Sequence, residues 1–148
     1  MKRAIKLFMI CLMMVVAAIA TAQAQTKEET MAWLKEKLEK CGGDDVTKSH
    51  FTNVQVSPCE ISYISHSLLG EANNSFNPAD VKMWKFFDDK TGLIADTEVI
   101  KIVYCKSGRT LSDSRLNIRN REGNIHKRMI KALLHLATFC EEDKSETF

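Results

Sequence analysis

Apolar residues recur at every third or fourth position near both ends of the chain, and at every second position between them. The first apolar stripe consists of Met31, Leu34, Leu38 and Cys41. This spacing places the side chains on one face of an α-helix. Thr26 and Glu29 have the form of a capping box, which predicts that the helix begins there. Gly42 and Gly43 predict its end, because glycine adopts the left-handed conformation that follows many helices without steric cost. Glu36 and Lys40 are spaced for an ion pair on the exposed side of this helix.

The central region favours strands. Apolar residues alternate with polar ones over residues 51–56, 59–64, 81–87, 97–105 and 115–119, the pattern of extended chain with one face toward a core. Residues 68–78 contain Gly70, Asn73, Asn74 and Asn77, and this composition predicts a loop. In residues 97–105 both faces carry apolar side chains, which predicts a central strand. Residues 115–119 alternate with charge and predict a more exposed edge strand.

The clearest periodicity lies near the C-terminus. One face of a helix there would carry Ile125, Met129, Ala132, Leu133, Leu136, Ala137 and Cys140. This is the pattern of an amphipathic helix packed on a sheet, and residues 141–148 follow it as a polar, mobile tail. A helix, about five antiparallel strands and a second helix define an α+β fold. Residues 25–148 have the length of a single domain.

Residues 1–24 predict a signal peptide. Lys2, Arg3 and Lys6 precede an uncharged apolar run from Leu7 to Ala20, and Ala22 and Ala24 occupy the small-residue positions before a cleavage site. Cleavage would leave Gln25 as the new N-terminus of an exported protein, either periplasmic or secreted. The apolar run falls short of the roughly 20 residues that span a bilayer, so we expect no stable membrane anchor after cleavage.

Removal of residues 1–24 changes the charge of the protein. The full chain has 21 basic and 19 acidic residues and a formal charge of +2. The segment carries three of the basic residues and none of the acidic ones, so the charge of the remaining chain is −1. A domain with this balance lacks the clustered positive charge that nucleic acids require. Nucleic-acid binding is therefore not expected.

Four cysteines follow the predicted cleavage site: Cys41, Cys59, Cys105 and Cys140. In an oxidising compartment this even number permits one or two disulfides in any of three pairings, and we expect at least one. The alternative is that some of them are buried as small apolar side chains. No CxxC sequence occurs, so the spacing of a thioredoxin-type redox site or a zinc knuckle is absent.

Other residues with reactive side chains give no catalytic motif. His50, His66, His126 and His135 occur in neither an HxxxH nor an HExxH arrangement. Asp88 and Asp89 lack the alternating oxygen ligands of a calcium loop, and residues 89–92 are typical of a hairpin turn. We therefore expect no cofactor, no metal and no catalytic residue.

The opening helix carries Trp33, Leu34, Lys37 and Leu38, and the closing helix carries Ala132, Leu133, His135 and Leu136 before a terminal Phe148. In these positions the chain resembles a group of small exported bacterial domains with no assigned activity. This resemblance implies a non-catalytic binding or accessory domain, whose partner is an unknown protein or small molecule. Trp33 lies off the apolar stripe, either folded over the helix edge or in a recognition surface. A sheet closed by one C-terminal helix also resembles a pleckstrin-homology-like interaction module. A small hydrolase with His66 or His126 as base is another alternative.

Overall fold

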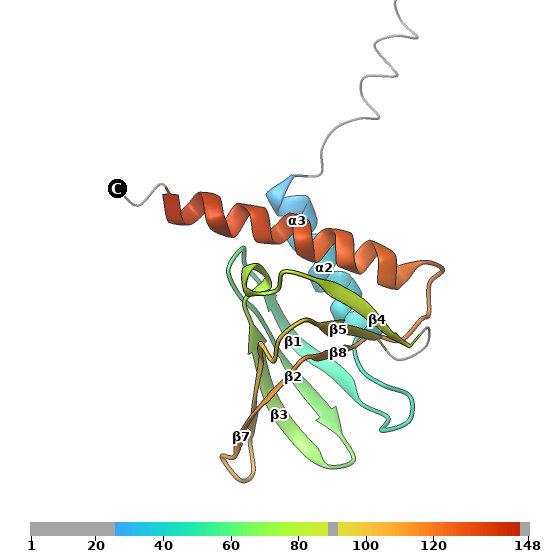
Figure 1. Cartoon of the computed structure of the whole chain (residues 1–148). Helices are drawn as coiled ribbons and strands as arrows, with labels where there is room; N and C mark the ends of the chain where they lie inside the picture. Colours follow the sequence, from blue (N-terminus) through green and yellow to red (C-terminus); the bar gives the residue numbers. More distant parts are fainter. Residues whose placement is uncertain (1–25, 89–91, 146–148) are drawn as a thin grey trace, which may run out of the picture.

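The computed structural model describes residues 26–88 and 92–145, so the predicted signal peptide and residues 89–91 and 146–148 lie outside the described residues. The described chain contains a long helix at each end, α2 and α3, with strands and one short 3₁₀ helix, η2, between them (Figure 1). Their bounds are α2 (Lys27–Cys41), β1 (His50–Val56), β2 (Ile61–Ser67), β3 (Gly70–Phe76), η2 (Pro78–Asp80), β4 (Trp84–Asp88), β5 (Gly92–Ala95), β6 (Ile100–Tyr104), β7 (Thr110–Asp113), β8 (Arg115–Asn117) and α3 (Ile125–Ser145).

The strands form two antiparallel sheets, with α3 across the top of both and α2 beside β1 (Figure 1). The larger sheet has the order β1-β2-β3-β6-β7, and the smaller one has the order β4-β5-β8. β6 lies between β3 and β7, which confirms the predicted central strand. The architecture is the predicted α+β fold, with its strands divided between two sheets.

The N-terminal cap of α2 is the predicted capping box. Thr26 Oγ1 accepts a hydrogen bond from the Glu29 amide at 3.2 Å, and Glu29 Oε2 accepts one from the Thr26 amide at 3.0 Å. These two bonds satisfy amide groups that a helix start leaves without partners. After the helix, Gly43 has a φ of 112°. A side chain there would be strained and would also meet the backbone of Ser49, which explains why glycine ends this helix.

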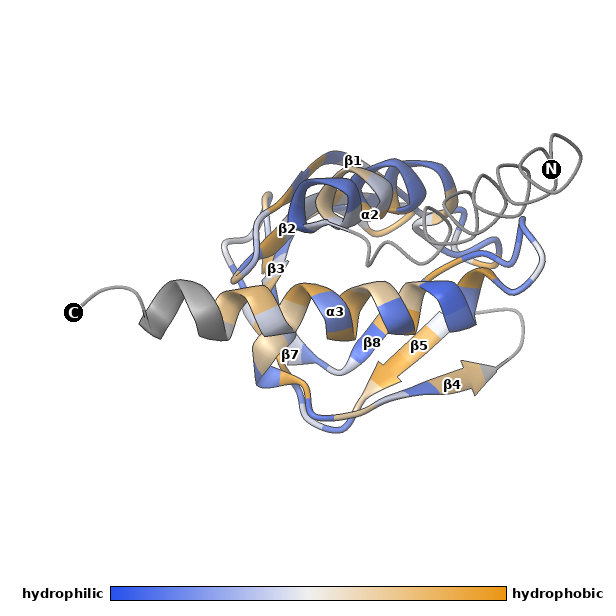
Figure 2. Cartoon of the chain, turned by 90° about the horizontal axis from the view of Figure 1, so that it is seen from above, coloured by the Kyte–Doolittle hydropathy of each residue, from blue (hydrophilic) through white to orange (hydrophobic). Residues whose placement is uncertain are grey.

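α3 buries the predicted apolar stripe. Ile125, Met129, Leu133, Leu136 and Cys140 are fully buried. Figure 2 shows hydrophobic and hydrophilic residues alternating along α3, with the hydrophobic strand β5 below it. The helix continues through Ser145, so residues 141–145 of the segment expected to form a mobile tail are helical.

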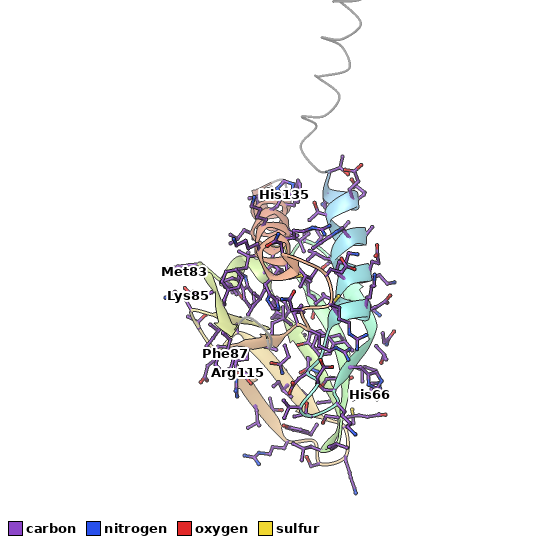
Figure 3. The ribbon with its side chains drawn as sticks, turned by 90° about the vertical axis from the view of Figure 1, so that its right-hand side faces the viewer. His66, Met83, Lys85, Phe87, Arg115 and His135 are labelled. Carbon is purple, nitrogen blue, oxygen red and sulfur yellow. A yellow bond between two sulfur atoms is a disulfide. The ribbon has the colours of Figure 1, made fainter. Side chains whose placement is uncertain are left out.

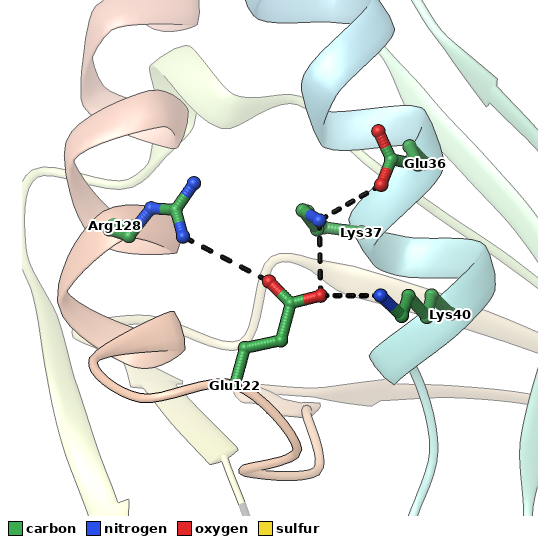
Figure 4. A network of polar contacts seen from close by, with 5 residues as sticks. All are labelled: Glu36, Lys37, Lys40, Glu122 and Arg128. Carbon is green, nitrogen blue, oxygen red and sulfur yellow. Dashed lines mark hydrogen bonds and ion pairs between the residues drawn. The ribbon is translucent and has the colours of Figure 1, made fainter.

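Ion pairs connect α2 to the segment before α3. Glu122 Oε1 lies 2.8 Å from Lys40 Nζ and 3.1 Å from Lys37 Nζ, and Glu122 Oε2 lies 3.9 Å from Arg128 Nη1 (Figure 4). Lys37 also pairs with Glu36 at 2.9 Å. The expected pair of Glu36 with Lys40 was therefore wrong, since Lys40 reaches across to Glu122. Hydrogen bonds from Lys40 and Lys37 lower the pKa of Glu122. Hydrogen bonds to Glu36 and Glu122 raise the pKa of Lys37.

The strand predictions were correct in part. Residues 68–78 do not form a loop, because Gly70–Phe76 is β3 and pairs along its whole length with β2. Its asparagines are weak strand formers, but the ladders on both sides override that preference. β5 and β7 were not predicted. β8 is an edge strand as expected, yet Leu116 and the nearby Ile118 are fully buried.

Cys59 and Cys140 form a disulfide across 81 residues, joining the turn before β2 to α3. Cys41 is free and buried, and Cys105 is free and exposed. The expectation of at least one disulfide thus agrees with the structure, which also selects one pairing. In the part of the chain that the structure describes, no helix is long and apolar enough to cross a membrane.

Candidate functional site

The inner face of the larger sheet changes character from one end to the other. Cross-strand neighbours on β2 and β3 are Ile61 with Phe76 at one end, then Tyr63 with Asn74, and Ser65 with Ala72. Ile61 and Phe76 are buried in the core, and the short η2 helix that follows β3 contacts α3. Beyond Tyr63 the inward residues become small or polar. This face is therefore core at the helix end and polar at the opposite end, which we call the open end.

A pocket of about 160 Å³ occupies the open end. Its walls come from every strand of the larger sheet and from β8, with single residues from the two edge strands, Phe51 of β1 and Asp113 of β7. The polar residues of the lining are Thr47, Ser49, Tyr63, Ser65, Ser67, Asn74, Tyr104, Asp113, Arg115 and Asn117. Its apolar residues include Phe51, Ala72, Ile100 and Ile102. The mixture of aromatic walls and convergent polar groups is typical of small-molecule sites.

Asn74 lies at the inner wall of the pocket and is 6 % exposed. Its Nδ2 donates to Ser65 Oγ and to the carbonyl of Ala72, both at 2.9 Å. These two bonds use both amide protons and fix the orientation of the side chain. The Asn74 Oδ1 atom makes no hydrogen bond to the described residues. The amide therefore offers an acceptor beside the pocket.

Tyr63 is 5 % exposed, and its ring stacks on Phe51 with a centroid distance of 4.1 Å. Its hydroxyl makes no hydrogen bond within the described chain. Burial, and to a smaller extent the negative charge of Asp113, hold the pKa of Tyr63 far above its usual value. The hydroxyl is therefore neutral at physiological pH, and its oxygen can accept a hydrogen bond as well as donate one.

Asp113, the last residue of β7, lies in the same lining. Its Oδ1 accepts from the amides of Ser114 and Arg115 at 2.7 and 3.0 Å, and from Arg115 Nε at 3.4 Å. The Asp113 Oδ2 atom has no hydrogen bond among the described residues. The Arg115 guanidinium lies over the Phe87 ring, 5.7 Å from its centroid, and Figure 3 places the two side chains together at the β4 side.

His66 lies on the opposite face of β2 from the pocket, as the alternation with Ser65 and Ser67 requires. Its Nδ1 is 3.0 Å from Glu71 Oε1, and its Nε2 is 2.8 Å from Thr52 Oγ1. The ring also stacks on His50 at a centroid distance of 4.9 Å. A carboxylate, an imidazole and a hydroxyl thus form a row on the outer surface of the sheet.

The other histidines have structural contacts. His126 is buried and its Nε2 lies 2.7 Å from the carbonyl oxygen of Ile118, so this nitrogen is not open to a substrate. A separate hollow of about 340 Å³ borders the residue. His135 packs edge-on against Phe139. Trp33 is half-buried against the core, with Arg128 5.1 Å from its ring centroid, which supports the packing interpretation of this residue.

The predicted cysteines do not meet in one site. Cys59 and Cys140 are bonded to each other, while Cys41 lies in the core and Cys105 lies near Asn73 at the β6–β7 turn. Burial raises the pKa of the Cys41 thiol, so this cysteine is a poor nucleophile. Among the residues that the structure describes, no three histidine, cysteine or acidic side chains are grouped to hold a metal.

Sequence reasoning missed the pocket residues. Asn74 was predicted to lie in a loop, and Asp113 was not among the candidate residues. One signal was present in the sequence: Ser65 and Ser67 continue the inward positions of Ile61 and Tyr63 along one strand. Small polar residues at positions that should face a core indicate that the core ends there.

No family model matches this chain, and neither a curated protein nor a solved structure is similar to it.

Proposed function

We propose that this protein is an exported, non-catalytic binding domain that holds a small polar ligand in the pocket at the open end of its larger sheet. The observation that carries the proposal is the change along one sheet face, from the fully buried Ile61 to the polar group of Tyr63, Ser65 and Asn74.

Burial of polar groups is the first reason. A polar side chain in the interior costs free energy unless its polar atoms find a hydrogen-bond partner. Here Tyr63 and Asn74 are both more than nine-tenths buried as residues. The Tyr63 hydroxyl and Asn74 Oδ1 are nevertheless not among the described atoms that are fully buried without a partner, so the pocket leaves both atoms open to water or to a ligand. A ligand that bonds these atoms would replace that water.

The size of the pocket limits the ligand. A volume of about 160 Å³ is similar to the engineered cavity of about 150 Å³ that holds one benzene molecule. The pocket therefore fits a compound of this size, or one polar end of a longer molecule that extends into solvent.

The proposed location rests on other features. The signal-like segment at residues 1–24 supports export. The Cys59–Cys140 disulfide is also in keeping with an oxidising compartment. A periplasmic or secreted domain of this kind would capture its ligand outside the cytoplasm.

Occupation of the pocket is tested by NMR. The amide signals of the ¹⁵N-labelled protein are followed while a library of small polar compounds is added, and we expect shifts confined to residues around Tyr63, Ser65 and Asn74. In the Ser65→Leu variant a larger side chain enters the pocket and binding is lost. Ser62→Leu adds the same side chain to the outer face of the same strand and keeps binding. The proposal is wrong if no compound shifts these signals, or if both variants bind alike.

A second candidate function is hydrolysis, because His66 lies between Glu71 and Thr52 at distances of 3.0 and 2.8 Å. In such a row the carboxylate orients the imidazole, which takes the hydroxyl proton as the hydroxyl attacks an ester carbonyl. The imidazolium then gives this proton to the alcohol that leaves as the ester C–O bond breaks, and water hydrolyses the acyl group from the hydroxyl. The row lies outside the pocket lining, and Glu71 has a side-chain exposure of 59 %. The binding proposal is therefore preferred.

Hydrolysis is tested with an activated ester. A catalytic row predicts that His66→Ala lowers turnover at least 100-fold, whereas His135→Ala leaves it unchanged. Equal rates for these two variants would exclude the row as a catalytic site.

A further inference from the structure

We propose that the pocket at the open end recognises a small organic cation, with an ammonium or guanidinium group held between Asp113, Asn74 and the Tyr63 hydroxyl. This inference rests on the proposed function, since it specifies the ligand class of the same pocket.

The open hydrogen-bonding atoms of Asn74 and Asp113 favour a ligand that donates hydrogen bonds. Asn74 uses both amide protons internally, so its open atom is the acceptor Oδ1. All three hydrogen bonds to Asp113 go to Oδ1, so its second acceptor, Oδ2, is open and shares the negative charge. The ligand must therefore present donors to both side chains.

The Ser65 and Ser67 hydroxyls do not reverse this balance. Ser65 Oγ accepts from Asn74 and donates to the Ala72 carbonyl at 3.4 Å. Ser67 Oγ donates to the Gly70 carbonyl at 3.2 Å and accepts from the Leu69 amide. The protons of both hydroxyls thus have acceptors within the β2–β3 hairpin.

The charges of the pocket lining also favour a cation. Asp113 is the only carboxylate of the described pocket lining, and no lysine lines the pocket. Arg115 is the single described cation of the lining. Its Nε is bonded to the Asp113 oxygen that is already occupied, its guanidinium lies over Phe87, and its side chain is 53 % exposed. Solvent therefore screens the arginine more than the aspartate, whose side chain is 31 % exposed.

Aromatic rings also favour a cation in this pocket. Tyr63 and Tyr104 are both lining residues. Aromatic rings attract organic cations through the negative charge of their faces, and this attraction strengthens where water is excluded. A carboxylate, an amide oxygen and aromatic rings together favour a cation over a neutral molecule of the same shape.

Matched probes test the inference. The purified protein is titrated at constant ionic strength with butylammonium, butan-1-ol and butyrate, and separately with guanidinium and urea at millimolar concentrations, and the amide spectrum is recorded. We expect each cation to shift the pocket signals at a concentration at least about tenfold lower than its neutral counterpart, because charge-assisted hydrogen bonds are stronger than neutral ones. Butyrate should not bind.

Asp113→Asn is the central variant, since the asparagine Oδ1 can still accept the amides of Ser114 and Arg115. It should weaken cation binding about tenfold or more and leave the response to butan-1-ol unchanged. Asp96→Asn removes the same charge from an exposed residue outside the described lining and should have no effect. Tyr63→Phe provides a second measurement if Asp113→Asn does not fold, with an expected loss of about threefold to tenfold.

Two outcomes overturn the inference in different ways. If a neutral probe or butyrate binds in the pocket at least as well as the cations, the cation assignment is wrong and the proposed binding function stands. If neither these probes nor the compound library shifts the pocket signals, both proposals fail. Equal effects of Asp113→Asn and Asp96→Asn would show attraction by overall charge without a specific contact.

Discussion

The two ends of the β2–β3 ladder share one backbone arrangement and differ in what their side chains contribute. At the helix end, Ile61 and Phe76 are buried in the same core as Leu133 and Leu136 of α3. At the open end, the inward positions are Ser65 and Ala72, next to the polar Asn74. Apolar burial contributes roughly 25 cal/mol per Å², whereas a buried hydrogen bond contributes about 1 kcal/mol net. The helix end therefore provides most of the stability, and the open end remains available for recognition.

Truncation of a core side chain at the helix end should have the largest effect. Leu136 is fully buried, so Leu136→Ala should lower the free energy of unfolding by about 2–5 kcal/mol through lost burial and a remaining cavity. Lys131, on the exposed side of α3, should tolerate alanine within about 0.5 kcal/mol. Urea denaturation of both variants measures the difference, and equal midpoints would contradict the assignment of α3 to the core.

Loss of the Cys59–Cys140 disulfide should have the second largest effect on the free energy of unfolding. The double variant Cys59→Ser, Cys140→Ser should lose roughly 2–4 kcal/mol, because the bond constrains a long loop of the unfolded chain. A protein that lacks residues 1–24 should show only the thiols of Cys41 and Cys105 on unfolding. Cys105→Ser is the control and should leave the denaturation midpoint unchanged. Four reactive thiols in protein that has never been reduced would contradict this pairing.

The Glu122 network should give a smaller, pH-dependent effect. Its carboxylate has a pKa below the usual value of 4.5, chiefly because Lys40 and Lys37 donate to it. A lowered folded-state pKa adds stability above the unfolded-state pKa, and this stability is lost as the pH falls through the folded value. Glu122→Gln should therefore be less stable than wild type at pH 7, and the difference should shrink below about pH 4.5.

The control for this prediction is Glu39→Gln, which removes an exposed acid of α2 outside the network. It should keep the pH dependence of the wild type. A difference between Glu122→Gln and wild type that persists unchanged at acid pH would mean that the ion pairs do not stabilise the contact between α2 and the start of α3.

Local patterns in the sequence predicted the helix end of the molecule well. The Thr26–Glu29 capping box and the α3 stripe depend on residues three or four positions apart, so periodicity shows them directly. Both helices appear where they were expected. The extension of α3 beyond Cys140 was missed because its polar residues carry no apolar periodicity.

The open end could not be predicted in the same way. β3 carries Asn73 and Asn74, which locally favour turns, and only pairing with β2 and β6 makes them a strand. The pocket then unites Asn74 with Asp113, which is distant in sequence. The partner of Cys140 likewise depends on where α3 crosses the turn before β2. Such long-range register has no local sequence signal.

The smallest predicted effect tests the comparison most directly, because it measures what one atom contributes to the stability of the fold and to ligand binding. The Tyr63 hydroxyl has no hydrogen-bond partner among the described residues and lines the pocket, where water can reach it. Tyr63→Phe removes this hydroxyl and keeps the ring stacked on Phe51. We expect the free energy of unfolding to change by less than about 1 kcal/mol, while ligand binding weakens. Tyr104→Phe, at a less buried tyrosine of the same pocket, should change stability less. A Tyr63→Phe protein that is less stable than wild type by more than about 1 kcal/mol would show that this hydroxyl supports the fold, and the division between the two ends would then be wrong at Tyr63.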